Sequence, residues 1–445
     1  MNILIFGRAL AGLGGAGMWN ATYLILTQLI PFAKRAALFG ILGVFYILAT
    51  VMGTLVGGGF TNMSHTGWRW CFYVNLPIGG LTIALLAVFL PTCKVMLPFD
   101  GKPDDRAWWQ KLATIDWVGA ILTLAFVTTL GIGTQWGGVT KAWSHRDVIG
   151  SFVACGVSFI LLILWSIFLG PRAMVPMSLF KSAHFSAVCF VAFFAYGACV
   201  NMLYYLSVYF QAIKNTSPIR TGVVLLGLQA SICFFLVLSA KFGERTGYAK
   251  APMVIGSIIT AIAIGIYTTI GTNTTIAVTV GLEVLAGCGC GLVMNLMTVI
   301  MQAEFVSRKS MSLWATNVFN FWGFIGRIIC LTVATNVFEN KLKLSLYKVR
   351  EPGMSVEIGT AILASPKAIA SDIVPDTLRP TLRTLYAKAI SDVWWVTTAV
   401  ALCLVVSCLL LKDIRINSVN DARKTNTNAG SEPKPASGRA GPVEV

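Results

Sequence analysis

Charged side chains are scarce in this sequence. Asp, Glu, Lys and Arg make up only 12% of the 445 residues, whereas 56% are hydrophobic. This balance excludes an ordinary soluble domain, in which about a quarter of the residues are charged. It is typical of a protein that crosses the membrane several times.

The residue types that enzymes and pumps depend on are also few. The three histidines, His65, His145 and His184, lie near expected loops without nucleophilic or metal-ligating neighbours. The sequence lacks the glycine-rich loop, followed by Lys and Ser/Thr, that binds nucleotide phosphates. We therefore expect no enzymatic activity, no ATP-driven transport, and no metal or organic cofactor.

The eleven cysteines do not form the pattern of a disulfide framework. Most stand singly in apolar segments, where cysteine behaves as a small hydrophobe. Cys288 and Cys290 form a Cys-x-Cys, but clustered partners for a metal ion are missing from the sequence around them. The pattern favours a packing role for these thiols.

Long apolar runs fill most of the chain. Lipid offers the backbone no hydrogen-bond partners, so apolar stretches of roughly 20 residues in a membrane must be helical. Counting such stretches predicts an all-α polytopic bundle with about 11 transmembrane helices. Their expected limits are 3–31, 36–61, 71–91, 115–136, 148–169, 186–212, 221–240, 251–271, 276–301, 312–338 and 392–411.

Three segments outside these spans are long. We expect a cytoplasmic loop at 92–114, an extracellular loop at 339–391 and a disordered cytoplasmic tail at 412–445. The apolar rhythm of the extracellular loop predicts amphipathic helices that lie on the membrane surface. The residues that carry this rhythm are Ile369, Ile373, Leu378, Leu382, Leu385, Tyr386 and Ile390.

The formal net charge of +16 does not imply a nucleic-acid partner. Lysine and arginine concentrate in the tail and in the loops on one side of the alternating path, as the positive-inside rule and anionic lipid headgroups favour. We expect that side to be cytoplasmic. The opposite side carries Asn-x-Ser/Thr sequences at Asn62, Asn215 and Asn273, which are candidate N-glycosylation sites.

Arg8 stands in a largely apolar run near the start of the chain. A guanidinium stays protonated, so within hydrocarbon it must face a partner or a watery cavity, and such residues tend to mark transport pathways. Gly12, Gly14 and Gly15 follow, and they would let another helix approach closely. The alternative is an arginine near the helix end that extends toward the membrane surface.

Three stretches resemble motifs of the major facilitator superfamily. The first is similar to motif B, and its matching residues are Leu4, Arg8, Gly12, Gly14 and Ala16. The second resembles antiporter motif C at Gly53, Gly57 and Gly58, with Ala49 and Thr54 in place of a Gly and a Pro. The third, at 68–80, reads WRWCFYVNLPIGG and resembles a signature of the fourteen-helix drug:proton antiporters, especially fungal ones. Shorter pieces at 116–119, 204–212 and 287–291 fit the same subfamily.

The resemblance implies a division into domains. Motif B lies on the fourth helix in this family, so we expect the chain to begin three helices late, without the first-helix Asp associated with proton coupling. Residues 1–91 would be the three-helix remainder of the N-terminal bundle, 115–170 two linker helices, and 171–411 a C-terminal six-helix bundle. The resemblance also implies that Arg8 takes part in proton coupling and that the motif C glycines form a hinge or seal.

Ionisable residues deep in expected spans must be neutral or paired. Glu283 is a candidate proton or cation site, or else a neutral acid hydrogen-bonded between helices, and Arg327 could pair with it or with a carbonyl. Aromatic and amide side chains on two spans are candidates for a cavity wall that suits an amphipathic substrate, or for helix packing. They are Asn201, Tyr204, Tyr205, Tyr209, Gln211, Asn295 and Gln302.

These features predict a secondary active transporter. We expect proton-coupled efflux of a small amphipathic toxin, drug or secondary metabolite by alternating access, with the proton gradient as the energy source. The alternative is a truncated homologue that does not transport, a membrane sensor or a pseudogene product. We expect a monomer in the plasma membrane, with the vacuolar membrane as the alternative, and with substrate, protons and lipid as its partners.

Overall fold

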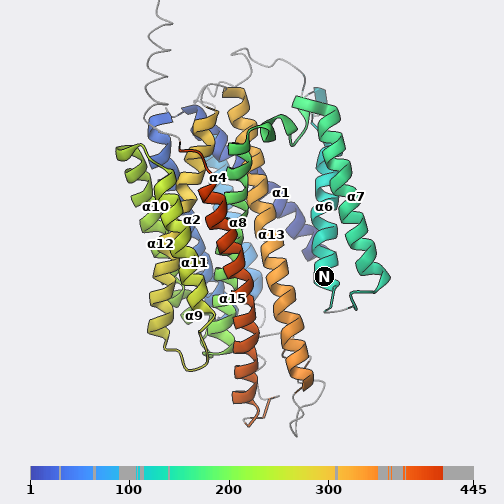
Figure 1. Cartoon of the computed structure of the whole chain (residues 1–445), viewed down its shortest axis with the longest axis vertical. Helices are drawn as coiled ribbons and strands as arrows, with labels where there is room; N and C mark the ends of the chain where they lie inside the picture. The colour runs from blue at the N-terminus through green and yellow to red at the C-terminus, as the bar shows by residue number, and fades with distance from the viewer. Residues whose placement is uncertain are drawn as a thin grey trace, which may run out of the picture.

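The computed structural model describes residues 2–29, 32–63, 67–89, 107, 109–110, 115–138, 141–305, 309–348, 359, 362, 374–375 and 377–413. Within these ranges the chain forms helices and no multi-residue strand, which confirms the all-α expectation. The long helices lie roughly side by side (Figure 1). The α-helices of the described chain, long and short, are α1 (Asn2–Leu29), α2 (Phe32–Met63), α3 (Trp70–Tyr73), α4 (Asn75–Phe89), α6 (Trp117–Trp136), α7 (Arg146–Leu169), α8 (Ala183–Ala212), α9 (Pro218–Val224), α10 (Leu226–Thr246), α11 (Lys250–Tyr267), α12 (Ile276–Glu304), α13 (Lys309–Lys348) and α15 (Arg379–Leu409).

Ten helical stretches of the described chain are long and apolar enough to cross a membrane. Each overlaps one of the expected spans, and α9 and α10 together make one of the ten, Pro218–Gly243. The remaining expected span, 3–31, is occupied by the 28-residue helix α1. The protein is therefore a multi-pass membrane protein.

Several helices begin or end where the local sequence favours it. The Ser182 hydroxyl accepts a hydrogen bond from the Phe185 N–H at 3.2 Å and caps α8. Ser217 caps α9 in the same way, and Pro218 occupies the first turn, where its missing N–H does no harm. Gly247, with φ of 71°, ends α10 in the left-handed conformation.

The segment expected to lie on the membrane surface belongs instead to the bundle. Helix α13 continues to Lys348, and α15 already begins at Arg379, so both are longer than the expected spans. Leu378, Leu382, Tyr386 and Ile390 are buried in the core cluster that includes α8 and α11. These apolar side chains therefore pack against other helices and not against lipid. Ile369, Ile373 and most of 92–114 lie outside the described residues.

Three glycines place α12 between two neighbours. A Cβ at Gly287 or Gly291 would run into α10, and one at Gly291 would lie 2.6 Å from the Ile232 carbonyl oxygen. A Cβ at Gly289 would lie 2.5 Å from the Gly256 oxygen of α11. Residues four apart share one helix face and the residue between them points the other way. The alternating glycines thus let α10 and α11 both approach the α12 backbone.

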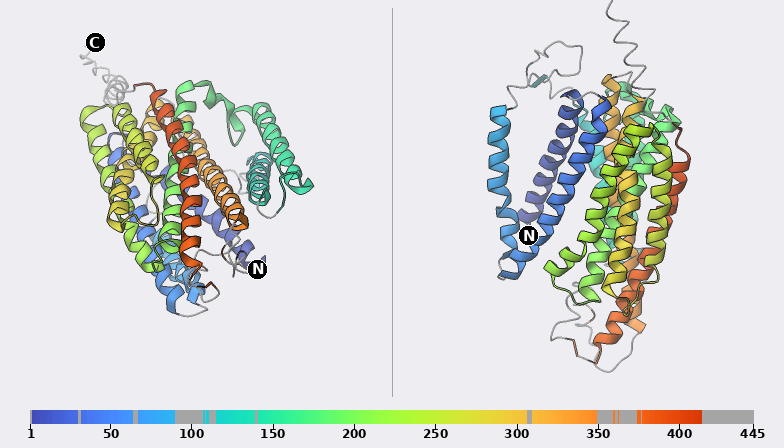
Figure 2. Two further views of the ribbon diagram at one scale, coloured as in Figure 1. Left: turned by 60° about the horizontal axis from the view of Figure 1, so that its bottom comes forward. Right: turned by 90° about the vertical axis from the view of Figure 1, so that its left-hand side faces the viewer.

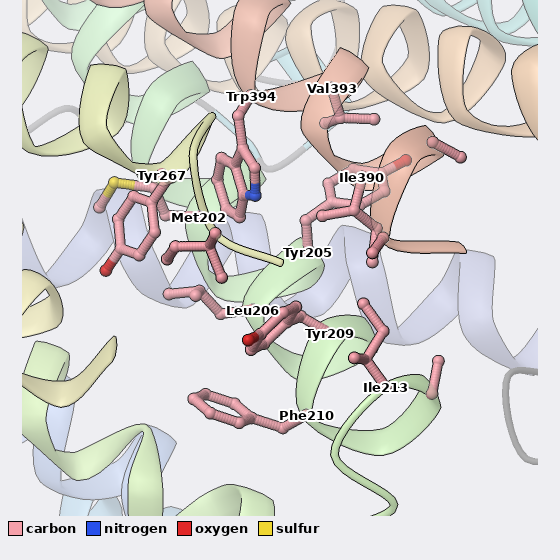
Figure 3. Close-up of a cluster of buried hydrophobic side chains, with 14 of the residues drawn as sticks. Met202, Tyr205, Leu206, Tyr209, Phe210, Ile213, Tyr267, Ile390, Val393 and Trp394 are labelled. Carbon is pink, nitrogen blue, oxygen red and sulfur yellow. The ribbon is translucent and has the colours of Figure 1, made fainter. Parts of the chain in front are cut away.

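The hydrophobic core lies among helices α8 to α15. In one cluster, side chains from α8 meet Tyr267 of α11 and Trp394 of α15 (Figure 3). The rings of Tyr267 and Trp394 stack with centroids 4.8 Å apart. By contrast, α4 has no buried residue and stands at the outer edge of the molecule, away from α10 and α12 (Figure 2). Helix α2 joins the first helices to the rest of the molecule, because it packs against α10, α9 and α12.

Helices α6 and α7 form a hairpin beside α13 (Figure 1). The Asn336 amide of α13 donates hydrogen bonds to the carbonyl oxygens of Thr134 and Gly137 at the end of α6. At the first turn of α6, the Asp116 carboxylate caps the helix. The hairpin is therefore fixed to the bundle through polar contacts at a helix end.

Asp116 joins three segments. Its carboxylate accepts hydrogen bonds from the Gly119 N–H at 2.8 Å, the Trp165 indole N–H at 2.8 Å and the Met174 N–H at 2.9 Å. Partial burial raises the pKa of this carboxyl, but the three donors outweigh burial and hold the pKa below its usual range. The start of α6, the end of α7 and the segment that follows α7 are thereby tied together.

Candidate functional site

A cavity of about 510 Å³ lies between α1 and α2 on one side and α8, α10, α12 and α13 on the other. Its walls are mainly apolar, with aromatic side chains on both sides. The aromatic lining residues are Trp19, Phe45, Tyr46 and Tyr196. The polar lining residues are Thr22, Thr50, Gln229, Asn295, Thr298 and Arg327. Trp19 and Tyr46 meet edge to face, with ring centroids 5.6 Å apart.

Each helix presents one face to this cavity. On α8 the lining residues are Tyr196, Cys199, Val200 and Leu203, which recur at the three- and four-residue spacing of one helix face. The lining residues of α10 follow the same spacing, from Gln229 through Ile232 to Leu236. The cavity therefore follows from how each helix is rotated about its own axis.

Arg327 brings a positive charge to the cavity wall. Its guanidinium carbon lies 4.3 Å from the centroid of the Tyr196 ring and 5.3 Å from that of Phe324. Both distances are in the range of cation–π attraction. Gly323 and Gly326 on the same helix allow this approach, because a Cβ at Gly326 would overlap the Phe193 carbonyl oxygen of α8.

Two buried amides also line the cavity. Asn295 is 3% exposed, and neither polar atom of its amide has a hydrogen-bond partner. Gln229 is 6% exposed, and its amide oxygen is also without a partner. Buried polar groups in proteins are nearly always hydrogen-bonded. These amides are therefore available to a ligand in the cavity.

The other aromatic and amide candidates from the sequence lie elsewhere. The Asn201 amide donates to the Cys330 carbonyl and the Thr397 hydroxyl, each at 3.4 Å, and the Tyr205 hydroxyl donates to the Thr335 hydroxyl at 3.3 Å. These contacts join helices of the core. Tyr204 is 48% exposed, Gln211 donates to a serine one turn away at 3.1 Å, and Gln302 is buried near the end of α12. Of the amide and aromatic candidates, Asn295 lines the cavity. Arg327 lines the same cavity.

Glu283 is fully buried on α12 but does not line the cavity. One carboxylate oxygen lies 3.0 Å from the position of a Cβ on Gly227 of α10, and neither oxygen has a hydrogen-bond partner. The described chain contains no ion pair between Glu283 and Arg327, since Arg327 faces the cavity and the Tyr196 ring. The two ionisable residues thus occupy separate environments.

The motif B residues lie on the surface of α1. Arg8, Gly12 and Gly14 are exposed, and a Cβ at either glycine would have no neighbour within 4 Å. Gly15, the next glycine of the same run, lines the cavity.

The motif C residues lie on α2. Gly53 has open space at its Cβ position, and a Cβ at Gly57 would lie 4.0 Å from the Cys71 sulfur. At Gly58 the Ile219 backbone nitrogen of α9 comes within 3.3 Å of the Cβ position. The last glycine of this motif thus permits contact between α2 and α9.

Two of the candidate glycosylation sites lie on adjacent loops. Asn215 and Asn273 are exposed, and the Lys214 ammonium donates to the Thr272 carbonyl at 2.6 Å, which joins the two loops. Burial lowers the pKa of Lys214 from its ordinary value. The two sites therefore share one end of the bundle, as the alternating path requires. The Asn62 side chain lies outside the described residues.

Comparison with known proteins agrees with this architecture. Residues 1–329 match the family model of the Major Facilitator Superfamily. The MFS-type transporter thnB of Trichoderma harzianum is 36% identical over 354 residues, which cover 80% of this chain and 59% of thnB. The efflux pump aflT of Aspergillus parasiticus is 30% identical over 407 residues (92% of this chain, 76% of aflT), and the efflux pump mokI of Monascus pilosus is 33% identical over 399 (88% and 72%). The chain spans 59% of the length of thnB, and it belongs to the major facilitator superfamily.

Proposed function

We propose that this chain exports a small amphipathic toxin, drug or secondary metabolite in exchange for protons. The observation that carries the proposal is the cavity between α1 and α2 and the helices α8 to α13. Apolar and aromatic walls with a few polar groups suit the burial of an amphipathic compound whose orientation is fixed by hydrogen bonds. The names of aflT and mokI as efflux pumps favour export as the direction.

Alternating access is the proposed mechanism. Helices α8 to α15 share a well-packed core, and the first helices contact them mainly through α2. Rocking of one group against the other would expose the cavity to each side of the membrane in turn. We propose that a monomer does this in the plasma membrane, with Asn215 and Asn273 on the outside.

Glu283 is the proposed proton carrier. A carboxyl buried between α10 and α12, without a hydrogen-bond partner, suits a group that gains and loses a proton as its surroundings change. We also propose that Arg8 belongs to the coupling network, because it matches the arginine of motif B. A neutral Glu283 that serves helix packing is the competing interpretation.

Transport of a neutral fluorescent coumarin by the purified chain in lipid vesicles tests this function. An imposed pH gradient should drive coumarin accumulation above the level of protein-free vesicles, and a protonophore should abolish the difference. If neither coumarin nor anionic fluorescein accumulates above the level of protein-free vesicles, transport is refuted. Coumarin binding without accumulation would favour the alternative, a membrane sensor or a homologue that does not transport.

A further inference from the structure

The charge of the cavity wall is positive and unbalanced. Of the 20 lining residues, Arg327 carries the only charge, and none is acidic. Across the described ranges, no carboxylate forms an ion pair with Arg327. Because a guanidinium cannot release its proton, the wall keeps this charge throughout the transport cycle.

The aromatic rings beside Arg327 satisfy its charge only in part. Tyr196 and Phe324 offer ring faces at 4.3 and 5.3 Å. Ring faces attract a cation but do not supply the in-plane oxygen acceptors that the five N–H donors of a guanidinium match best. A carboxylate or phenolate in the cavity would supply both the negative charge and those acceptors.

Asn295 and Gln229 extend the polar part of the cavity. Both are more than nine-tenths buried and line it with amide atoms that have no partner. The Asn295 amide nitrogen can donate to an anionic oxygen, and the Gln229 amide oxygen can accept from a ligand hydroxyl. The remaining apolar and aromatic wall would bury a hydrophobic body.

We infer that the cavity selects amphipathic organic anions, with Arg327 as the residue that binds the carboxylate or phenolate. This inference rests on the proposed function and names the substrate class of the same cavity. A cationic compound of equal shape would meet the like charge of Arg327 and be repelled. Selection therefore depends on the sign of the charge more than on the size of the compound.

Binding to the purified full-length chain in detergent tests the inference without requiring transport. Fluorescein is anionic at neutral pH, and rhodamine 123 is a cation built on the same xanthene scaffold. We expect the chain to bind fluorescein at least about tenfold more tightly than rhodamine 123, as opposite charges a few ångströms apart at intermediate dielectric imply. Equal binding, tighter binding of rhodamine 123, or no binding of fluorescein would overturn the inference.

Variants assign the selectivity to one residue. Arg327→Gln should lower fluorescein affinity at least about tenfold and leave rhodamine 123 affinity equal or higher, whereas Arg327→Lys should keep the preference for the anion. Arg245→Gln is the matched control, because Arg245 is exposed in the last turn of α10 and does not line the cavity. An unchanged dye preference in Arg327→Gln would refute the role of Arg327. If that variant does not fold, the preference of the unaltered chain and of Arg327→Lys still decides the inference.

The outcomes separate this inference from the proposed function. Absence of gradient-driven transport of both coumarin and fluorescein, with fluorescein preferred in the binding assay, would refute the transport function and leave the ligand class standing. Driven coumarin transport with no preference for the anion would do the reverse.

Discussion

The guanidinium of Arg327 lies on the ring of Tyr196, with its central carbon 4.3 Å from the ring centroid. The two residues come from α13 and α8, which approach closely because Gly323 and Gly326 have no side chains. A Cβ at Gly323 would lie 2.6 Å from the Tyr196 ring. The position of the single charge in the cavity therefore depends on an aromatic face and on two glycines.

Replacement of Tyr196 should show how far its aromatic ring positions Arg327 for ligand binding. Tyr196→Phe keeps the ring face, whereas Tyr196→Leu removes it and should weaken fluorescein binding by about 0.5–2 kcal/mol, the usual strength of a cation–π contact. Fluorescein titration of both variants measures the difference. Equal affinities in Tyr196→Phe and Tyr196→Leu would show that the ring does not position Arg327.

The contact between α11 and α12 should not tolerate a methyl group. In Gly289→Ala the new Cβ would lie 2.5 Å from the Gly256 oxygen and 2.6 Å from the Thr260 nitrogen, both backbone atoms that cannot move aside cheaply. We expect a loss of about 1–3 kcal/mol in stability. Gly281→Ala on the same helix is the control, since nothing lies within 4 Å of its Cβ position. Thermal unfolding in detergent should show a lower midpoint for Gly289→Ala alone.

The helices were largely predictable from sequence because hydropathy and backbone hydrogen bonding are local properties. The errors have physical causes. The last part of α13 contains Glu339, Lys341 and Lys343, so hydropathy falls there while the helix continues. Charged side chains at the end of a span do not disturb the backbone hydrogen bonds that define the helix.

The cavity was predictable only in part. Asn295 and Asn201 both stand as polar residues in apolar spans, yet one lines the cavity and the other joins helices. Periodicity gives the faces of a single helix but not which neighbour each face meets. Tyr196, Gln229 and Trp19 were missed for this reason, although the three- and four-residue spacing around Tyr196 was a signal that could have found one wall.

Asp116 should stabilise the α6–α7 hairpin in a pH-dependent way. Its pKa is lower in the folded protein than in the unfolded chain, so its contribution is present above the unfolded pKa of about 3.9 and is lost as pH falls through the folded pKa. Asp116→Asn places an amide where the Met174 N–H and two other donors require acceptors. We expect faster hydrogen exchange in α6 and α7 in this variant.

The pH profile distinguishes this role from simple packing. Thermal unfolding of the unaltered chain and of Asp116→Asn should differ by a constant amount at neutral and mildly acidic pH, and the difference should shrink below about pH 3.9. Trp165→Phe removes one of the three donors. It should lower the unfolding temperature by less than Asp116→Asn does, with the same dependence on pH. A difference in unfolding temperature that persists unchanged at the lowest pH would contradict a role for the ionised Asp116 carboxylate.

The proposed orientation in the membrane predicts glycosylation at the loop between α11 and α12. Asn273 is exposed there, beside the loop that carries Asn215. In a eukaryotic host, glycosidase treatment should increase gel mobility, and Asn273→Gln should remove part of that shift. Cysteine substituted at Thr274 should also react with an impermeant thiol reagent added outside the cell. Reaction only after permeabilisation would place this loop inside the cell and contradict the proposed orientation.

Proton coupling should depend on Glu283. Glu283→Gln keeps the size of a neutral acid but cannot take up or release a proton, so coumarin accumulation should lose its dependence on the pH gradient while coumarin binding and thermal stability stay unchanged. Arg8→Ala should also lower gradient-driven accumulation if motif B takes part in coupling. Asp392→Asn is the control, because Asp392 pairs with Lys341 at 3.6 Å on a partly exposed surface. Gradient-driven accumulation that is unchanged in both Glu283→Gln and Arg8→Ala would place the coupling group elsewhere in the chain.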